Sequence, residues 1–351
     1  KAFEPIARAA IAYAHSRGAR VIIHAVELET ARLAVQSGTD ILAHSVFDTD
    51  VDDAFIELLH ARNVIYTPTL IVVGNYGYTF HGKPNLTEHD LRFANPDVVA
   101  TLFQMQDVES ALPAETVAAI RSRRVPEAPH AAMRNLKRIH DAGIRIAAGT
   151  DAGNIGTQHA SSLYDEFITM VDCGLSARDV LKTATQGGAA LLNRSPDLGT
   201  IAPGKIADLA ILEADPLADI RAVAHVRDVV KGGVVYKAAT LVHEPLEYVV
   251  QRQANAFNFH DAAVFAESYA PHAKMRRDGK LIASSRAEIQ AYYAERFKKY
   301  AALHTEILSR DTRGSTVTDK QRVMGISDKP EDATLTFTLQ HGLIEAVDVQ
   351  T

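Results

Sequence analysis

The feature that most constrains the fold is a regular alternation of short apolar segments with longer amphipathic ones. The short segments are about five residues long and rich in β-branched residues, which is typical of buried parallel strands. They are residues 20–24, 40–44, 63–68 and 144–148. The longer segments repeat their apolar residues at helical spacing and are residues 3–14, 28–36, 51–62, 130–142, 160–173 and 176–192. This alternation predicts a parallel sheet covered by helices, either half of an eight-stranded α/β barrel or one doubly wound sheet.

The rest of the chain departs from this alternation in three places. A long stretch, 69–129, separates the last two apolar segments, and we expect it to form a loop over the end of the sheet with one helical piece at 98–110. Residues 199–212 and 226–236 each predict two short strands around a turn, which together make a small β module. Residues 243–351 predict helices followed by alternating strands, an α+β domain with an antiparallel sheet.

These patterns divide the chain into three expected domains. Their boundaries are 1–198 for the α/β part, 199–240 for the β module and 241–351 for the α+β part. In the last part, the expected helices are 246–258 and one that follows Arg286, and the expected strands are 303–313, 315–326, 333–340 and 343–349.

Composition excludes several classes of function. The net charge of −6 gives no electrostatic reason to expect a nucleic-acid partner. No apolar run approaches the length of about 20 residues that a membrane span needs, so we expect no membrane partner. The single cysteine, Cys173, excludes an internal disulfide framework and a cysteine-based zinc site.

Three polar residues stand at equivalent places in the predicted sheet. His24, His44 and Asp151 each follow an apolar strand, at the end where α/β folds build their active sites. Two imidazoles and a carboxylate are common ligands of zinc and similar divalent ions. One histidine after a strand is usually a hydrogen-bonded structural residue, and Asp151 alone would be explained as a helix cap. The occurrence of all three favours a metal site.

The motifs around these residues resemble the amidohydrolase superfamily, in its imidazolonepropionase-like and Xaa-Pro-dipeptidase-like branch. The resemblance covers about residues 2–237. The segments that carry it are 13–24, 38–44, 67–69 and 147–151, with the closing signature in 185–192 and 198–212.

The resemblance implies a role for each candidate residue. His24 and His44 would be metal ligands after the fifth and sixth strands of a TIM-type (β/α) barrel. Asp151, after the eighth strand, would bind the metal, take a proton from the nucleophilic water and pass it to the leaving group. The implied cofactor is a divalent metal, with zinc as the expected ion. The implied substrate is a small amide or dipeptide-like molecule, and its identity stays open.

The chain also departs from the family pattern. The family carries a His-x-His pair on its first strand and often a metal-bridging lysine on its fourth, and this chain contains no His-x-His. Lys1 lies too close to the first predicted helix to replace that lysine. We therefore expect a partial barrel, strands five to eight, with β-sandwich strands at 199–240. Half a barrel leaves open sheet edges unless another segment completes it.

The C-terminal part resembles the SnoaL-like, NTF2-like family of cone-shaped α+β folds. The segments that carry this resemblance are 255–265, 269–271, 286–293 and 340–347. Members are isomerases, small-ligand binders or dimerisation modules, so the resemblance also suggests a homo-oligomer formed through this domain. His272 stands where many relatives carry an aspartate. His260 and Asp261 are either an acid–base pair or a helix cap.

The sequence therefore leads to one main hypothesis and two alternatives. The main hypothesis is a metal-dependent hydrolase of carbon–nitrogen bonds, incomplete in this chain. The alternatives are a non-catalytic or ligand-binding protein that acts through the NTF2-like domain, and an isomerase activity of that domain. One cysteine fits a reducing cytoplasm, although a secreted relative would have the same composition once its signal was removed.

Overall fold

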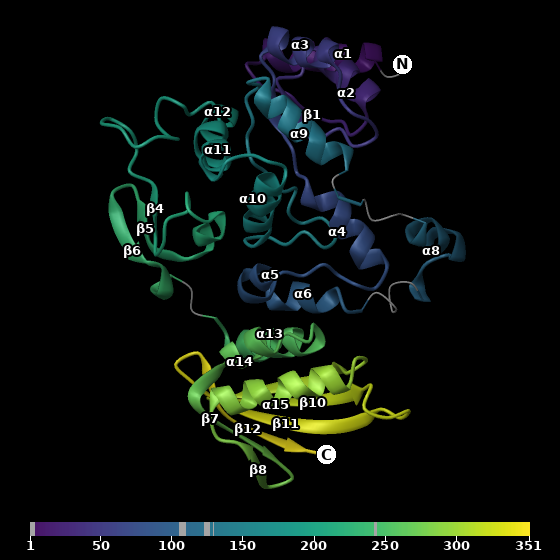
Figure 1. Ribbon diagram of the computed structural model, residues 1–351, viewed down its shortest axis with the longest axis vertical. Coiled ribbons are helices and arrows are strands. Elements are labelled where there is room, and N and C mark those ends of the chain that lie inside the picture. Colours follow the sequence, from purple (N-terminus) through teal and green to yellow (C-terminus); the bar gives the residue numbers. More distant parts are fainter. Residues whose placement is uncertain (1–3, 105–109, 123–126, 129, 242–243) are drawn as a thin grey trace. The chain divides into compact units, whose positions relative to one another are not determined.

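The computed structural model describes residues 4–104, 110–122, 127–128, 130–241 and 244–351 (Figure 1). The protein chain forms two compact units, which we call the first unit and the second unit. The first unit comprises Lys1–His81 and Ala118–Leu241, and the second comprises Gly82–Val117 and Val242–Thr351. Within the described ranges, no helix is long and apolar enough to cross a membrane. The domain boundaries expected at residues 198 and 240 stay predictions.

The first unit is built on a small parallel sheet. Strands β1 (Ile22–His24), β2 (Ile41–Ala43) and β3 (Ile65–Thr67) pair in the order β1-β2-β3. A parallel bridge between Tyr66 and Ile146 adds the fourth expected strand beside β3. Neighbours in sequence are thus neighbours in space, as along the wall of a barrel, whereas a doubly wound sheet reverses its order at a switch point. The assignment to barrel strands five to eight stays a prediction.

Helices alternate with these strands as predicted. They are α1 (Glu4–Ser16), α2 (Leu28–Ser37), α3 (Asp53–Arg62), α9 (Ala131–Asp141), α10 (Ser162–Asp172), α11 (Ala177–Lys182) and α12 (Gly188–Leu191), with a π-helical turn at Thr183–Gly187. The stretch after β3 adds α4 (Ile71–Phe80), α5 (Glu88–Phe93), α6 (Pro96–Thr101) and α8 (Ala114–Arg121). Fully buried Phe55, Tyr66, Ile139 and Met170 belong to one core in the first unit.

The β module contains fewer strands than expected. Its strands β4 (Leu209–Leu212), β5 (Val226–Lys231) and β6 (Val234–Lys237) form an antiparallel sheet, and short 3₁₀ helices lie at Ile220–Ala224 and Ala238–Thr240. The prediction of two strands in 199–212 was wrong for the first of them. Gly199 and Gly204 have φ angles of 88° and 85°, so the backbone turns there instead of extending.

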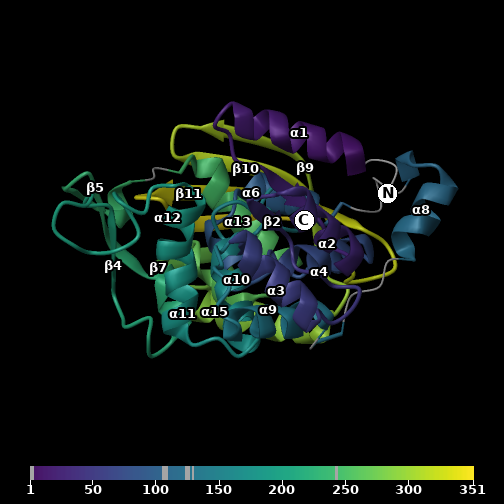
Figure 2. The ribbon, with the colours of Figure 1, turned by 90° about the horizontal axis from the view of Figure 1, so that it is seen from above.

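The second unit contains a six-stranded sheet with the order β8-β7-β12-β11-β10-β9. Its strands are β7 (Tyr269–Arg277), β8 (Lys280–Ala283), β9 (His304–Arg313), β10 (Thr316–Met324), β11 (Glu331–Gln340) and β12 (Leu343–Gln350). Helices α13 (Leu246–Asn258), α14 (Ala262–Glu267) and α15 (Arg286–Lys299) lie along one side of it (Figure 1; seen from above in Figure 2). The α+β class is confirmed. The sheet is mixed rather than antiparallel, because β12 pairs with β7 in parallel.

Part of the long stretch after β3 belongs to the second unit. Leu91 and Val99, on α5 and α6, lie in the same buried core as Phe265 and Phe337. The Arg252 guanidinium on α13 donates to the backbone oxygens at the end of α5, at 3.2 Å to Leu91 and 2.8 Å to Ala94. Of the helical piece expected at 98–110, α6 accounts for the beginning, and residues 105–109 lie outside the described chain.

Candidate metal and catalytic site

The three residues singled out at strand ends come together in the first unit. His24 is the last residue of β1, His44 follows β2, and Asp151 follows the stretch that bridges to β3. The imidazole rings of His24 and His44 meet edge to face, with centroids 4.4 Å apart. Nε2 of His44 lies 3.8 Å from Oδ2 of Asp151. His44 is therefore the centre of the group. Lys1, which was considered from the sequence as a metal-bridging lysine, lies outside the described residues.

Thr69 orients the imidazole of His44. A hydrogen bond of 2.6 Å joins His44 Nδ1 to Thr69 Oγ1, and both side chains are buried. With Nδ1 occupied, Nε2 is the nitrogen left to face Asp151. Histidines that bind metals are usually held by their second nitrogen in this way. In the sequence, Thr67–Thr69 stands out only as part of a motif, and nothing there indicates a role for Thr69.

The backbone is strained at each of these positions. His44, Thr69 and Asp151 have φ angles of 75°, 46° and 56°, in the left-handed region that non-glycine residues rarely adopt. Such residues cost of order 1–3 kcal/mol each and persist only where the surrounding structure holds them. The backbone N–H of His44 donates to Thr67 O at 2.8 Å and that of Ser45 to Pro68 O at 2.8 Å, which supplies part of that support. Three strained residues this close together point to a functional site.

A buried carboxylate holds the segment that carries Thr69. Glu166 on α10 accepts the backbone N–H groups of Leu70 at 2.8 Å and of Ile71 at 3.2 Å. The side chain is fully buried, and this burial raises the pKa of Glu166 to about 7, although the two N–H donors oppose the rise. Nothing in the sequence separates Glu166 from an ordinary surface residue of a helix, so sequence patterns did not predict its role.

Helix α4 braces the loop that follows Asp151. The Asn75 amide donates to the backbone oxygen of Gly156 at 3.0 Å, and the Tyr76 hydroxyl hydrogen-bonds to Oδ1 of Asn154. Gly156 has a φ angle of 77°, and a Cβ there would lie 2.7 Å from Oγ1 of Thr79. Only glycine satisfies both conditions. The loop that follows Asp151 is thus held by contacts from a helix about 75 residues earlier in the chain.

The electrostatic environment favours the neutral form of the His44 imidazole. Burial lowers the pKa of His44, the neighbouring His24 lowers it further, and Asp151 opposes them. A lowered pKa favours the neutral imidazole, which is the form that binds metals. His24 and Asp151 are exposed, whereas His44 is only 9% exposed, so the group has one buried member and two that face solvent.

The donor set fits a divalent metal in its chemistry. Two imidazoles and one carboxylate from three strand ends are the kind of ligands that zinc takes, and the Thr69 hydrogen bond completes the usual support of such a histidine. Among the residues that the structure describes, no group of three or more His, Cys, Asp and Glu side chains is gathered closely enough to enclose an ion. A small pocket of about 40 Å³ lies beside His44, Thr69 and His130, and neither His24 nor Asp151 lines it.

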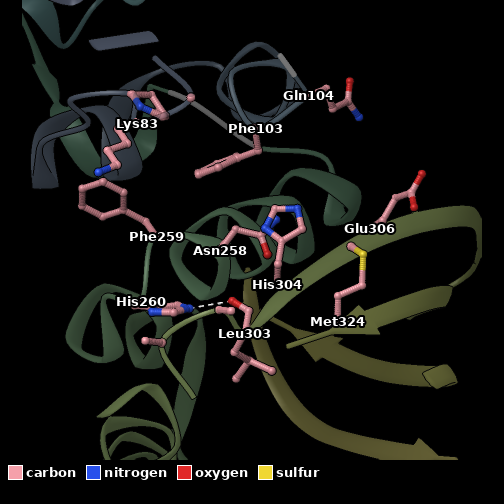
Figure 3. Close-up of a pocket in the computed structure, with 14 residues that line it drawn as sticks. Lys83, Phe103, Gln104, Asn258, Phe259, His260, Leu303, His304, Glu306 and Met324 are labelled. Carbon is pink, nitrogen blue, oxygen red and sulfur yellow. Dashed lines mark hydrogen bonds between the residues drawn. The ribbon is translucent and has the colours of Figure 1, made fainter. Parts of the chain in front are cut away.

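Two other sequence candidates have structural roles. Asp261 caps α14, because its Oδ1 accepts the backbone N–H groups of Ala263 at 3.0 Å and Val264 at 2.9 Å. His260 Nε2 hydrogen-bonds to Leu303 O at 2.6 Å (Figure 3). Two roles were left open for this pair, an acid–base pair and a helix cap, and the structure supports the helix cap.

Comparison with known proteins places this geometry in context. The profile described as "Amidohydrolase family" matches residues 4–236. Imidazolonepropionase from Streptomyces avermitilis is 41% identical over 81 residues, which are 23% of this chain and 19% of that protein. Imidazolonepropionase from Rhodococcus jostii is 36% identical over 108 residues, 30% of this chain and 26% of that protein.

Solved structures match both parts of the chain. A Xaa-Pro dipeptidase with methionine bound in its active site is 25% identical, with a TM-score of 0.50, over 67% of this chain and 49% of the dipeptidase. The chain therefore spans about half of that protein and less of the imidazolonepropionases. A putative polyketide cyclase from Sinorhizobium meliloti is 21% identical over 29% of this chain and 93% of its own, with a TM-score of 0.27.

Proposed function

The chain belongs to the amidohydrolase family, and we propose that it is a metal-dependent hydrolase of carbon–nitrogen bonds. The observation that carries the proposal is the meeting of His24, His44 and Asp151, with Thr69 holding the central histidine. The proposed substrates are small amides, cyclic amides or dipeptides, in line with the imidazolonepropionases and the Xaa-Pro dipeptidase that the chain resembles.

In this proposal, His24, His44 and Asp151 hold one divalent ion, with zinc as the expected metal. When bound, such an ion lowers the pKa of a water ligand towards neutrality and polarises the carbonyl of the scissile bond. His44 supplies Nε2, because Nδ1 is occupied by Thr69. Asp151 takes the proton of the attacking water at its carboxylate and returns it to the leaving nitrogen, which would otherwise depart as an unstable anion. Its exposed position lets it reach a substrate from solvent.

Cobalt binding tests the ligand assignment without relying on turnover. Co²⁺ replaces zinc in such donor sets and reports its coordination through visible absorption bands. We expect one Co²⁺ per chain in the wild type and an affinity at least about tenfold lower in His24→Ala, His44→Ala and Asp151→Asn. His60→Ala is the matched control, because His60 hydrogen-bonds to Ala142 O in the same unit and belongs to no metal group. Equal binding by His44→Ala and the wild type would refute the assignment.

Turnover tests the proposed reaction. The metal-loaded chain is incubated with imidazolone propionate and, separately, with a set of Xaa-Pro dipeptides. We expect hydrolysis of at least one of them, and a kcat at least about 100-fold lower in Asp151→Asn, since general acid–base groups contribute that much or more. Asp172→Asn, an exposed aspartate on α10, should leave the rate unchanged. A metal-loaded chain inert towards both kinds of compound would count against the activity while leaving the metal site standing.

A further inference from the structure

The loop that follows His44 depends on contacts to which the proposed function assigns no role. This loop comprises residues 45–51 and forms neither helix nor strand. It begins with His44 at a φ angle of 75°, in the left-handed region. A residue in that conformation persists only where its surroundings hold it, because relaxation to an ordinary backbone conformation is downhill. The contacts that fix the 45–51 loop therefore decide whether His44 keeps its conformation.

Two buried side chains hold both backbone polar groups of Val46. The Val46 N–H donates to the Tyr66 hydroxyl at 3.1 Å, and the Asn135 amide donates to Val46 O at 2.8 Å. Val46 and Tyr66 are fully buried, and Asn135 is 1% exposed. Water therefore cannot easily replace either partner, and the loss of one would leave a buried backbone group without a hydrogen bond.

Asn135 also holds the remainder of the loop. Its amide donates a second hydrogen bond to Thr49 O at 2.8 Å, and its side-chain oxygen accepts the Val51 N–H at 2.8 Å. One side chain on α9 thus makes three hydrogen bonds to a loop about 85 residues earlier in the chain. Two donor hydrogens and an acceptor on one short side chain are the property of asparagine, and an aspartate or a leucine of similar size would lose the donors.

Tyr66 connects the 45–51 loop to the strand that leads to Asp151. Its backbone N–H donates to Arg145 O at 2.9 Å, and its backbone oxygen accepts the Ala147 N–H at 3.0 Å, while its hydroxyl binds the loop. Burial raises the pKa of Tyr66 to about 12, so the hydroxyl stays protonated at neutral pH. A single residue therefore contacts both the loop behind one candidate ligand and the strand before another.

The 45–51 loop is also tied to the segment that follows His24. The Phe47 N–H donates to Val26 O at 3.0 Å, and Oδ1 of Asp48 accepts the Leu28 N–H at 3.0 Å. The loop is thus linked by hydrogen bonds to the segments of all three candidate metal ligands.

From these contacts we propose that Tyr66 and Asn135 are positioning residues, which hold His44 in its metal-binding conformation before a metal is bound. This inference rests on the proposed function, because it concerns the same ligands. By fixing Val46, the two side chains keep the backbone of His44 from relaxing and thereby keep its imidazole directed at Asp151. Without them, the metal must restore that conformation when it binds, so its affinity falls. The geometry of the occupied site stays the same, because the ligands themselves are unchanged.

Cobalt titration separates a positioning residue from a ligand. Tyr66→Phe removes only the hydroxyl, and Asn135→Leu removes the amide at similar volume. We expect each to bind Co²⁺ about tenfold more weakly, since restoring one strained residue costs a factor of about that size. At saturation, the visible absorption bands of both variants should equal those of the wild type. His44→Ala, which removes a ligand, should change the bands.

Two controls separate this effect from a general loss of stability. Leu59→Ala destabilises the first unit at a fully buried site outside the loop, and Tyr236→Phe removes a hydroxyl from a side chain that is 43% exposed. Both should bind Co²⁺ as tightly as the wild type does. A decrease in affinity in Leu59→Ala equal to that in Tyr66→Phe would show that affinity follows stability alone, and would overturn the positioning role.

A measurement without metal distinguishes failure of this inference from failure of the proposed function. In the metal-free chain, the backbone chemical shifts of His44 report its φ angle. They should indicate the left-handed conformation in the wild type and in Leu59→Ala, and depart from it in Tyr66→Phe and Asn135→Leu. A wild type that binds no Co²⁺ would refute the proposed function, whereas a left-handed His44 in both variants would refute the positioning role. Tyr66→Phe, which keeps the aromatic ring in the core, decides the test alone if Asn135→Leu does not fold.

Discussion

Thr69 shows how one side chain controls the geometry of the candidate site. Its hydroxyl contacts Nδ1 of His44, and its own backbone is held in a left-handed conformation between Pro68 and the Leu70–Ile71 amides that bind Glu166. The imidazole therefore depends on a chain of contacts that ends at a carboxylate on another helix.

Removal of the Thr69 hydroxyl should weaken metal binding without unfolding the unit. Thr69→Val keeps the shape of the side chain and removes the hydrogen bond, and we expect a Co²⁺ affinity about tenfold lower, as for other residues that support a metal ligand. Thr69→Ser keeps the hydroxyl and should bind nearly as the wild type does. Wild-type affinity in Thr69→Val, with an unchanged melting temperature, would show that His44 needs no such support.

Glu166 should make the stability of the first unit decrease as the pH rises. Its pKa is about 7 in the folded state, against 4.5 in an unfolded chain. Between these values the folded state binds more protons than the unfolded state, so the free energy of unfolding falls from about pH 4.5 to about pH 7 and is then constant. This rise in the pKa of Glu166 corresponds to a loss of about 3 kcal/mol in the free energy of unfolding across that pH range.

Urea unfolding between pH 4.5 and 8 measures this effect. Hydrogen exchange of peptides from β2 and β3 then shows that the change in stability belongs to the first unit. The lowered pKa of His44 acts in the opposite direction, because stability gained from a neutral histidine rises with pH. The wild type must therefore be compared with Glu166→Gln, which removes only the carboxylate. Glu29→Gln, an exposed residue of α2, is the control. Identical pH profiles for the wild type and Glu166→Gln would contradict the prediction.

The elements with a clear apolar period formed where the sequence placed them, and the exceptions have local causes. The expected helix at 176–192 contains a π-helical turn, because the Ala148 N–H donates to Thr183 O at 3.2 Å and ties that turn to the strand end. Strand β7 escaped prediction, since its run contains Pro271, which disfavours strand interiors. Strand β1 is shorter than expected, because it comprises only Ile22–His24 of the predicted strand at residues 20–24.

Gly187, in the π-helical turn, should tolerate no side chain. A Cβ at Gly187 would lie 2.1 Å from the Ile146 backbone oxygen, whereas a Cβ at Gly188 would meet nothing within 4 Å. Gly187→Ala must displace the strand that leads to Asp151, and we expect a loss of about 1–3 kcal/mol in stability together with weaker Co²⁺ binding. Gly188→Ala should be neutral or stabilising by up to about 1 kcal/mol, because alanine is the better helix former. Equal melting temperatures for the two variants would show that this close approach is absent.

At the scale of the whole molecule, the two compact units do not follow the order of residues along the chain. Residues 82–117 lie within the stretch that the amidohydrolase profile matches, yet they belong to the second unit. The Asn255 amide donates to Pro96 O at 2.7 Å, and Arg92 forms an ion pair with Glu267. The chain therefore leaves the first unit after α4 and returns to it within α8.

Truncation of Leu91 should destabilise the second unit and not the first. Leu91 is 1% exposed in the core shared with Phe265, so Leu91→Ala should cost about 2–5 kcal/mol. Hydrogen exchange should rise in β10 and β11 and stay unchanged in β2 and β3. Leu59→Ala, at a fully buried site in the first unit, should give the reverse pattern. Faster exchange in β2 and β3 of Leu91→Ala would place this segment with the first unit instead.

The sequence alone determined the order and type of most elements, the α/β and α+β classes, and the three polar residues at strand ends. These properties are local, because they depend on the spacing of apolar residues and on what directly follows a strand. The tertiary structure decided the remainder. It brought His24 and Asp151 to His44, oriented that imidazole through Thr69, buried Glu166 beneath the segment, and placed residues 82–117 in the second unit. Each of these depends on contacts between residues far apart in the chain, and no spacing along a single sequence encodes them.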